Sequence, residues 1–369
     1  MNNCALTKPN SVAIFSSYFA RGSTLDSIFY SGITDVSITS IKYKDKLLHS
    51  TISNGYTADQ SFIFSPKTAL FSYALEELHL VPHKSLRTCA KIILLCANQL
   101  SPLLGFNRAV CINNSMLTTS LHPLEDDEII INTTKLHAQN FPKHYICVRS
   151  IGSFIDYQLS LKLKKIGYAM IASRNIYICE KPEEQIKHRR DNRKDSKLIN
   201  SLGLYFKELT NKQDCLDIER LYKALYLDKH CHLNPNYSQN FFWLAHKSGY
   251  INIKLLISLD GRIQGFIAYN RTSHTLSIPA MGYDQQIDHA KKLYKILINH
   301  AFQEAAKHNL ILHLSAGASS FKLSRGATSQ IEYTAIYAQH LNILKRTFIH
   351  ALSYISIHIA APIMKKFEV

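Results

Sequence analysis

The feature that most constrains the fold is a pair of apolar segments joined by Asp260-Gly261. Residues 251–259 and 262–271 (INIKLLISL and RIQGFIAYNR) flank this dipeptide and are rich in Ile, Leu and aromatic residues. Asp-Gly between two such segments is a strong signal for a β-hairpin with a tight turn. The chain is therefore expected to form an antiparallel pair of strands here, around which the neighbouring segments have to pack.

The segments around this hairpin follow an informative order. In sequence they are a helix (215–230), the hairpin (251–271), a third strand (274–284), a long amphipathic helix (285–309), a fourth strand (310–317), a polar loop (318–330) and a strand-like segment (331–338). Three consecutive antiparallel strands followed by a helical crossover to another strand give a mixed sheet with helices covering it.

The first half of the chain has a similar outline. A hairpin is predicted over residues 38–53, with its turn at 44–46, and a helix over 65–80 with Ser65 as its N-cap. The remaining elements are a buried helix (85–100), a strand (144–151), a helix (155–167) and a strand (168–179). No residue-by-residue repeat links the halves, so duplication is inferred from this order alone.

A polar and strongly charged stretch, residues 180–197 (EKPEEQIKHRRDNRKDSK), lies between the two halves. It is the clearest shift in composition, so we place the domain junction here. The predicted fold class is α/β (α+β), with two mixed-sheet domains in tandem and flanking helices. The predicted units are an N-terminal domain (1–182), a basic junction helix (183–200), a C-terminal domain (201–345) and an apolar, basic C-terminal helix (346–369).

The net charge of +16, from 43 Lys and Arg against 27 Asp and Glu, favours an anionic partner. Nucleotide phosphates, an acidic carrier protein, RNA and an anionic membrane surface all fit, and so does a basic surface that only keeps the chain soluble. The eight cysteines are scattered and form no CxxC pair, which is typical of buried thiols in a reducing compartment.

The location predicted from these features is cytoplasmic. The N-terminus MNNCALTKPNSVAIF lacks the basic and apolar regions of a secretory signal. No window reaches the roughly 20 consecutive apolar residues of a spanning helix, and the closest, residues 347–364, is broken by His350 and His358. This C-terminal segment has basic flanks, so it is expected either to pack on the body or to contact a membrane surface peripherally.

Four segments carry a resemblance to a known superfamily. They are LYKALYLDKHCHLNP (221–235), LDGRIQGF (259–266), AMGYD (280–284) and LHLSAGASSFKLSRGA (312–327). Together they resemble the GNAT-domain proteins related to the FemAB-type transferases and the CelD-like acetyltransferases. The resemblance extends over about two-thirds of the chain and is specific for fold rather than for substrate.

The resemblance implies two GNAT-like domains and the transfer of an acyl or aminoacyl group to an amine. The expected function is N-acyl transfer from acyl-CoA or an acyl carrier protein thioester, by direct attack in a cleft of the C-terminal domain. The acceptor would be the amine of a small molecule, a peptide or a lipid. The alternatives are a FemAB-like transferase that uses aminoacyl-tRNA, the one nucleic acid expected as a partner, and a non-catalytic binding protein that kept the fold.

The strand end at residues 278–283 is expected to splay and to expose backbone N–H groups, including those of Met281 and Gly282, to the donor carbonyl. Tyr283 is a candidate catalytic phenol that donates to a leaving thiolate; its alternative is a core tyrosine. The family's Q/R-x-x-G-x-G/A pyrophosphate loop is absent from GYDQQIDHAKKLY, residues 282–294. Standard binding of the CoA pyrophosphate is therefore in question.

Donor phosphates could instead be held by backbone N–H groups where the long helix is expected to begin, with help from nearby cations. The candidates are Asp284, Gln285, Gln286, Lys291 and Lys292. Asp284 could also be a simple helix cap, and the two lysines could lie on a solvated helix face.

The segment Ser315–Gly326 is the second part of the predicted site. Ser315 is a candidate catalytic residue, and Gly317 allows a ligand to approach the backbone closely. Lys322 and Arg325 lie three residues apart and would bind phosphate or carboxylate, unless they form structural ion pairs. His230 and Asp228, at a helix end, are candidates for acid–base chemistry.

Two further features remain open. The cluster of Arg189, Arg190, Arg193, Lys194 and Lys197 could dock a carrier protein, tRNA or an anionic headgroup, or be a solvated junction. The run His230-Cys231-His232 fits no standard zinc spacing, so no metal site is predicted.

Overall fold

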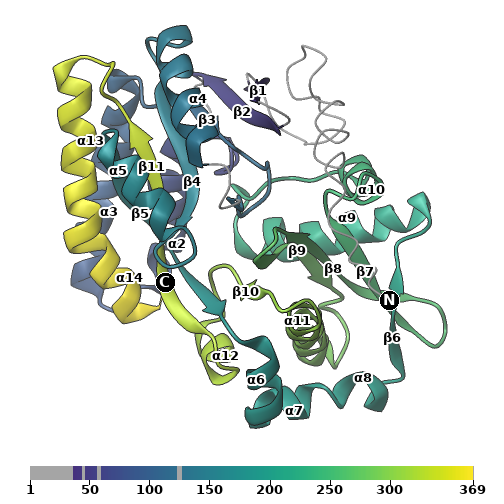
Figure 1. The fold of residues 1–369 in the computed structure, drawn as a ribbon. Coiled ribbons are helices and arrows are strands. Elements are labelled where there is room, and N and C mark those ends of the chain that lie inside the picture. The colour runs from purple at the N-terminus through teal and green to yellow at the C-terminus, as the bar shows by residue number, and fades with distance from the viewer. Residues whose placement is uncertain (1–35, 44–45, 56–59, 123–126, 369) are drawn as a thin grey trace.

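The computed structural model describes residues 36–43, 46–55, 60–122 and 127–368 (Figure 1). Its centre is a mixed sheet of eleven strands in the order β1-β2-β3-β4-β11-β5-β10-β9-β8-β7-β6. Helices cover both faces of this sheet, which confirms the predicted α/β class. The turn predicted at residues 44–46 lies partly outside the described residues, but the strands on either side of it are confirmed.

The N-terminal half supplies five strands of the sheet. They are β1 (Val36–Tyr43), β2 (Lys46–Asn54), β3 (Arg108–Ile112), β4 (Tyr145–Gly152) and β5 (Tyr168–Cys179). β1, β2 and β3 are antiparallel, whereas β3 and β4 are parallel and joined through α4 (Asp127–Asn140). A second helix, α5 (Tyr157–Lys165), joins β4 to β5.

The C-terminal half repeats this arrangement. Its strands are β6 (Leu204–Glu208), β7 (Asn252–Ser258), β8 (Ile263–Arg271), β9 (Thr275–Tyr283) and β10 (Ile311–His313). β6 to β9 form an antiparallel meander that contains the predicted Asp260-Gly261 turn, and α11 (Ala290–Lys307) joins β9 to the parallel β10. The connecting helices are α9 (Cys215–Lys223), a π-helical turn (Ala224–His230), α10 (Gln239–Lys247) and α12 (Ser319–Ser324).

The two halves share one continuous sheet. β5 pairs with β10, through Leu312–Cys179 and His313–Ile178, and so joins the strands of both halves. The strand β11 (Thr328–Tyr337) falls within the predicted C-terminal domain, yet it lies between β4 and β5 and is antiparallel to both. A strand from near the end of the chain therefore completes the sheet of the N-terminal half. The predicted domain boundaries remain a prediction.

The charged junction is partly helical, as expected. It forms α6 (Pro182–His188), α7 (Arg190–Asp195) and α8 (Leu198–Ser201), which pack beside α11. The helix predicted from Ser65 is present as a mixed π, α and 3-10 segment that includes α2 (Tyr73–Glu77), and the Ser65 hydroxyl accepts the Thr68 N–H at 3.0 Å.

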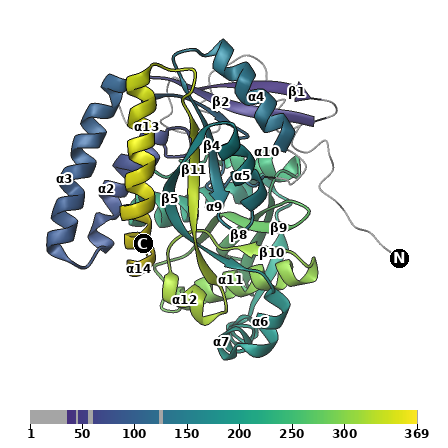
Figure 2. The same ribbon diagram turned by 60° about the vertical axis from the view of Figure 1, so that its left-hand side comes forward.

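Two helical segments on one side of the N-terminal half differ from the rest in their exposure. They are α3 (Lys84–Leu100) and the C-terminal run α13 (Ile343–Ile355), a π-helical turn (Ser356–Ala360) and α14 (Ala361–Phe367). Figures 1 and 2 both show α3 beside α13, outside the sheet. The helix over residues 85–100 was expected to be buried, and this is wrong, because α3 has no fully buried side chain.

Candidate active site

The parallel strands β9 and β10 separate after a short contact, as expected for residues 278–283. On β9, the pairing with β10 is confined to Thr275, Leu276 and Ser277, the first three residues of the strand. After His313 the chain turns away, and the Leu314 N–H donates to Tyr177 O at 2.9 Å on β5. The separation opens a cavity of about 380 Å³ whose walls include the far end of β9 and the segment that follows β10.

The pairing pattern of β9 turns two backbone N–H groups toward this opening. The N–H of Asp284 donates to Gln264 O of β8, and Phe266 and Gly282 are opposite each other. Because antiparallel strands alternate their bonding direction, the N–H groups of Met281 and Tyr283 point away from β8, toward the side that β10 has left. Pro279 has the same orientation and has no N–H to leave unpaired.

The carbonyl of Pro279 accepts the Thr118 hydroxyl at 3.0 Å. This contact confirms that the free edge of β9 faces the cavity side and the N-terminal half. The pairing of β8 with β9 also shifts register between Ala268 and Asn270, across from Pro279, because a proline cannot donate a ladder hydrogen bond.

The opposite wall is a strained turn after β10. Ser315, Gly317 and Ala318 all have positive φ, of 60°, 76° and 51°, a conformation that is costly for the two residues with side chains. Lys322 stabilises the turn from inside, because its Nζ donates to Ser315 O at 3.2 Å and to Ala316 O at 2.7 Å. His313 adds a further contact, since its Nδ1 accepts the Ser315 N–H at 3.2 Å.

Lys322 is 3% exposed, yet it belongs to the cavity lining. Burial, together with the nearby Arg174 guanidinium, lowers the pKa of its amine to about 7. The ammonium also lies 5.2 Å from the centroid of the Tyr177 ring. This amine can therefore change its charge near neutral pH, unlike an exposed lysine.

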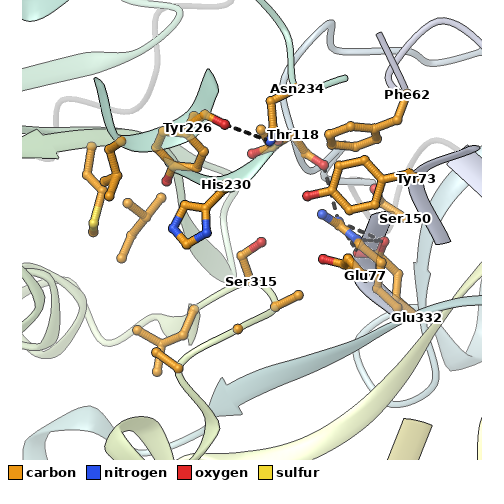
Figure 3. A pocket seen from close by; sticks show the side chains of 18 of the residues that line it. Phe62, Tyr73, Glu77, Thr118, Ser150, Tyr226, His230, Asn234, Ser315 and Glu332 are labelled. Carbon is orange, nitrogen blue, oxygen red and sulfur yellow. Dashed lines mark hydrogen bonds and ion pairs between the residues drawn. The ribbon is translucent and has the colours of Figure 1, made fainter. Parts of the chain in front are cut away.

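The side of the cavity formed by the N-terminal half is polar and charged. Arg174 donates to both carboxylate oxygens of Glu332, at 2.8 and 2.9 Å. Arg149 is buried, so the pKa of its guanidinium falls to about 10, and burial raises the pKa of the Glu77 carboxyl to about 6. Figure 3 shows Glu77, Glu332 and Tyr73 across the cavity from His230 and Ser315.

Burial and the adjacent Lys229 lower the pKa of His230, so its imidazole is neutral at pH 7 and can accept a proton. Burial raises the pKa of the Tyr283 phenol, which therefore keeps its proton and can donate. Both side chains line the same cavity.

The structure brings together six of the residues predicted for the site. The lining of the cavity includes Met281, Tyr283, His230, Ser315, Gly317 and Lys322. Eight others lie outside it, namely Asp228, Gly282, Asp284, Gln285, Gln286, Lys291, Lys292 and Arg325.

The long helix begins later than expected. Because α11 begins at Ala290, the backbone of Asp284, Gln285 and Gln286 precedes the helix and does not form its N-terminus. The Asp284 carboxylate instead accepts the Gln286 N–H at 2.9 Å in a local turn. Lys291 and Lys292 are exposed in the first turn of α11.

Arg325 forms the structural ion pair that was left open as its alternative. It is buried, and its Nη2 lies 2.6 Å from the carboxylate of Asp195 on α7. Gly282 faces away from the cavity, since a Cβ there would lie 2.7 Å from the Leu221 backbone of α9. Asp228 is exposed at the end of its helical turn.

Three of the charged cavity residues that the sequence analysis missed share one signal. Arg149, Arg174 and Glu332 each interrupt an apolar strand, namely β4, β5 and β11. A lone charge at a position where burial is expected has to be paired, and such pairs occur at functional sites. Their meeting in one cavity depends on the placement of β11, which no local pattern reveals.

The N-terminal half has an equivalent opening, but it is filled. β3 and β4 pair over four residues each and then separate, and residues 113–122 lie against the uncovered end of β4. Arg149 Nη1 donates to Asn114 Oδ1 at 3.0 Å, and the Ser120 N–H donates to Ser150 Oγ at 3.1 Å. Residues 116–120 are all buried, so this segment acts as an internal plug.

Comparisons with known proteins agree with this architecture. No family model and no curated protein matches the sequence. Among solved structures, L-PGS from Bacillus licheniformis matches 96% of this chain and 99% of its own, with a TM-score of 0.51 and 12% identity. FemX also matches with a TM-score of 0.51, over 96% of this chain and 100% of its own, at 8% identity. The chain therefore has the GNAT-type fold of these proteins over both halves.

Proposed function

We propose that the protein is an N-acyltransferase that transfers an activated acyl group to an amine in the cavity between β9 and β10. The observation that carries this proposal is the separation of these strands after Ser277, which turns the N–H groups of Met281 and Tyr283 toward the cavity. Donors fixed in this way are suited to stabilise a developing oxyanion, because they need no reorganisation during the reaction.

In this proposal the amine nitrogen attacks the acyl carbonyl carbon, whose oxygen accepts from the Met281 and Tyr283 N–H groups. The new C–N bond forms as the bond to the leaving group breaks. His230 takes the proton from the attacking amine, and the Tyr283 phenol donates one to the leaving sulfur or oxygen. Ser315 contributes to the wall beside the carbonyl, and Lys322 holds that wall in place.

The coarse activity, acyl or aminoacyl transfer, agrees with the fold of the neighbours. For the donor we propose a thioester of CoA or of an acyl carrier protein, bound without the usual pyrophosphate loop. Arg149 and Arg174 are opposed in the cavity by Glu332 and Glu77, and Lys322 adds a positive charge when it is protonated. An anionic group of the ligand would therefore find cations to pair with there.

Thermal shift measured with a panel of acyl-CoA and acyl carrier protein thioesters, followed by product detection with mixed amines, tests this function. A bound donor stabilises the fold by mass action, so at least one thioester is expected to raise Tm and to yield an amide. Wild-type protein that is neither stabilised nor active with any thioester would contradict the proposal.

Aminoacyl-tRNA is the second candidate donor. Two observations favour it. One is the whole-chain likeness to FemX and L-PGS. The other is a group of exposed basic side chains beside α11, namely Arg189, Arg190, Arg193, Lys194 and Lys197. Phosphate contacts weaken steeply with salt, so tRNA binding that falls about tenfold or more between low and physiological salt supports this donor. An Arg190→Ala/Arg193→Ala variant should lower that salt dependence, whereas thioester binding should stay unchanged.

A further inference from the structure

The structure points to a peripheral membrane-docking face on the N-terminal half, made by α3 together with residues 343–367. Of the nineteen exposed large apolar side chains among the described residues, twelve lie in residues 80–103 or 343–359. They include Ile92 at 58% exposure, Ile93 at 55%, Leu344 at 64% and Tyr354 at 65%. Clustering of this kind marks an interaction surface, whereas single exposed apolar residues are ordinary.

The two segments lie on the same side of the molecule (Figure 2). Leu94 and Ala97 of α3 pack against the same core cluster as Phe348 and Leu352 of α13. The inward faces of both helices are therefore fixed to one core, and the outward faces are left without a covering element in the part of the chain that the structure describes.

The charges within these two segments are of one sign. Residues 84–100 and 343–367 contain seven Lys and Arg and no Asp or Glu. The basic residues are Lys84, Arg87, Lys91, Lys345, Arg346, Lys365 and Lys366. Apolar side chains among basic residues are the pattern of helices that lie at an anionic bilayer surface, where each cation near the surface adds to binding.

The same charges argue against a second copy of the chain as the occupant. A two-fold dimer through this face would bring the same patch from both copies together, and its cations would face one another. Like charges across an interface oppose association, whereas anionic lipid headgroups complement them. We therefore assign the face to an anionic membrane surface.

The contacts of α13 favour a helix that lies along the surface over one that spans the bilayer. Among the described residues one helix, Ile343–Phe367, has the length and hydropathy of a membrane span. It is held along β5, however, by Ser353 Oγ donating to Met170 O at 2.7 Å and by the Ala172 N–H donating to Ser356 Oγ at 3.1 Å. Insertion across a bilayer would break these bonds and uncover Ile349.

Sedimentation of the full-length protein with sucrose-loaded vesicles tests the assignment. Vesicles of phosphatidylcholine alone are compared with equal parts of phosphatidylcholine and phosphatidylglycerol. The partition coefficient is expected to be at least about tenfold higher for the anionic vesicles and to fall as salt is raised. Equal partitioning into both, or none into either, would overturn the assignment.

Two variants separate the apolar from the basic contribution. An Ile92→Ser/Ile93→Ser/Ile355→Ser variant and a Lys365→Glu/Lys366→Glu variant are each expected to lose about tenfold or more in partitioning. Leu259→Ser is the matched control, because Leu259 is 84% exposed in the β7–β8 turn, far from the face in sequence. Circular dichroism and Tm establish that each variant folds.

Native cysteines allow contact with the membrane to be measured directly, without a variant that weakens vesicle binding. Cys89 and Cys96 on α3 are the exposed cysteines among the described residues. An environment-sensitive dye on Cys96, in a Cys4→Ser/Cys89→Ser background, should shift to the blue with anionic vesicles only. No shift would overturn the assignment. A concentration-dependent dimer that the apolar variant disperses, in the absence of vesicle binding, would assign the face to protein association instead.

Discussion

The two halves of the molecule contain the same opening between parallel strands, and only one of them is empty. In the N-terminal half the space beyond β3 is occupied by residues 113–122, which are anchored by the buried Arg149. In the C-terminal half the space beyond β10 is lined by backbone and side chains that leave a cavity.

Under the proposed function, one architecture serves for stability in one half and for ligand binding in the other. The plug satisfies the polar groups at the end of β4 internally, through Asn114, Ser120 and the Thr118 carbonyl. At the free edge of β9, the Thr118 hydroxyl donates to the Pro279 carbonyl, and a strained turn at Ser315–Ala318 lies opposite. Strain of this kind persists where the surroundings enforce it, which is common at functional sites.

Filling the cavity between β9 and β10 should have the largest effect on activity. Ala316→Trp places a large side chain in the cavity lining, so transferase activity is expected to fall about 100-fold or more, which corresponds to about 2.7 kcal/mol of transition-state stabilisation. The unfolding free energy should change little, because the space is not part of the core. Measured kcat/KM and chemical denaturation check both, and retained activity would contradict the account of the open half.

The second largest effect is expected on stability, when the contacts that hold residues 113–122 in the N-terminal half are weakened. Arg149→Met removes a charged donor from Asn114 Oδ1, which keeps the Met116 N–H, and from Thr118 O, which keeps Arg174 Nη2. Losing hydrogen bonds from a buried charged group costs about 1.5–3 kcal/mol. The unfolding free energy, measured in urea, is expected to fall by this amount. Arg190→Met, at an exposed position, is the matched control, and equal effects of the two would refute the structural role of the plug.

The buried amine predicts a pH dependence. Between about pH 7 and 10.5, the unfolded chain binds a proton at Lys322 that the folded protein does not, so folding stability rises with pH. The gain is at most about 1.4 kcal/mol per pH unit and should be absent from Lys322→Met. Denaturant titrations of both proteins across this range measure it. A wild-type profile parallel to that of the variant would place the lysine in a solvated environment.

The smallest effect is expected at the helix that follows the cavity. Lys291→Ala/Lys292→Ala changes exposed residues outside the lining, so stability should stay within about 0.5 kcal/mol. Activity with a free thioester should remain within about twofold of wild type, since neither side chain reaches the cavity. A large loss of donor affinity would show that phosphates extend along α11, as the sequence first suggested.

Local patterns were sufficient for much of the fold. The Asp260-Gly261 hairpin, β9 and the strands β4 and β5 are present as predicted. They depend on turn chemistry and on short-range alternation, which a sequence displays directly.

What the sequence could not show depends on distant contacts. The apolar run of α3 has the composition of a buried helix, and only the finished packing leaves it exposed. Glu332 pairs with Arg174 because β11 lies between β4 and β5. The two residues are 158 positions apart, too far for a local sequence pattern to indicate the contact. Arg325 likewise pairs with Asp195 of the junction, because α7 folds back beside α11.

The most direct measurement is a crystal structure of the protein with a non-hydrolysable thioether analogue of an acyl-CoA donor that raises its Tm. The account predicts that the acyl carbonyl oxygen lies within hydrogen-bonding distance of the Met281 or Tyr283 N–H, facing the Ser315 turn. An analogue bound elsewhere, with the space between β9 and β10 unoccupied, would contradict it.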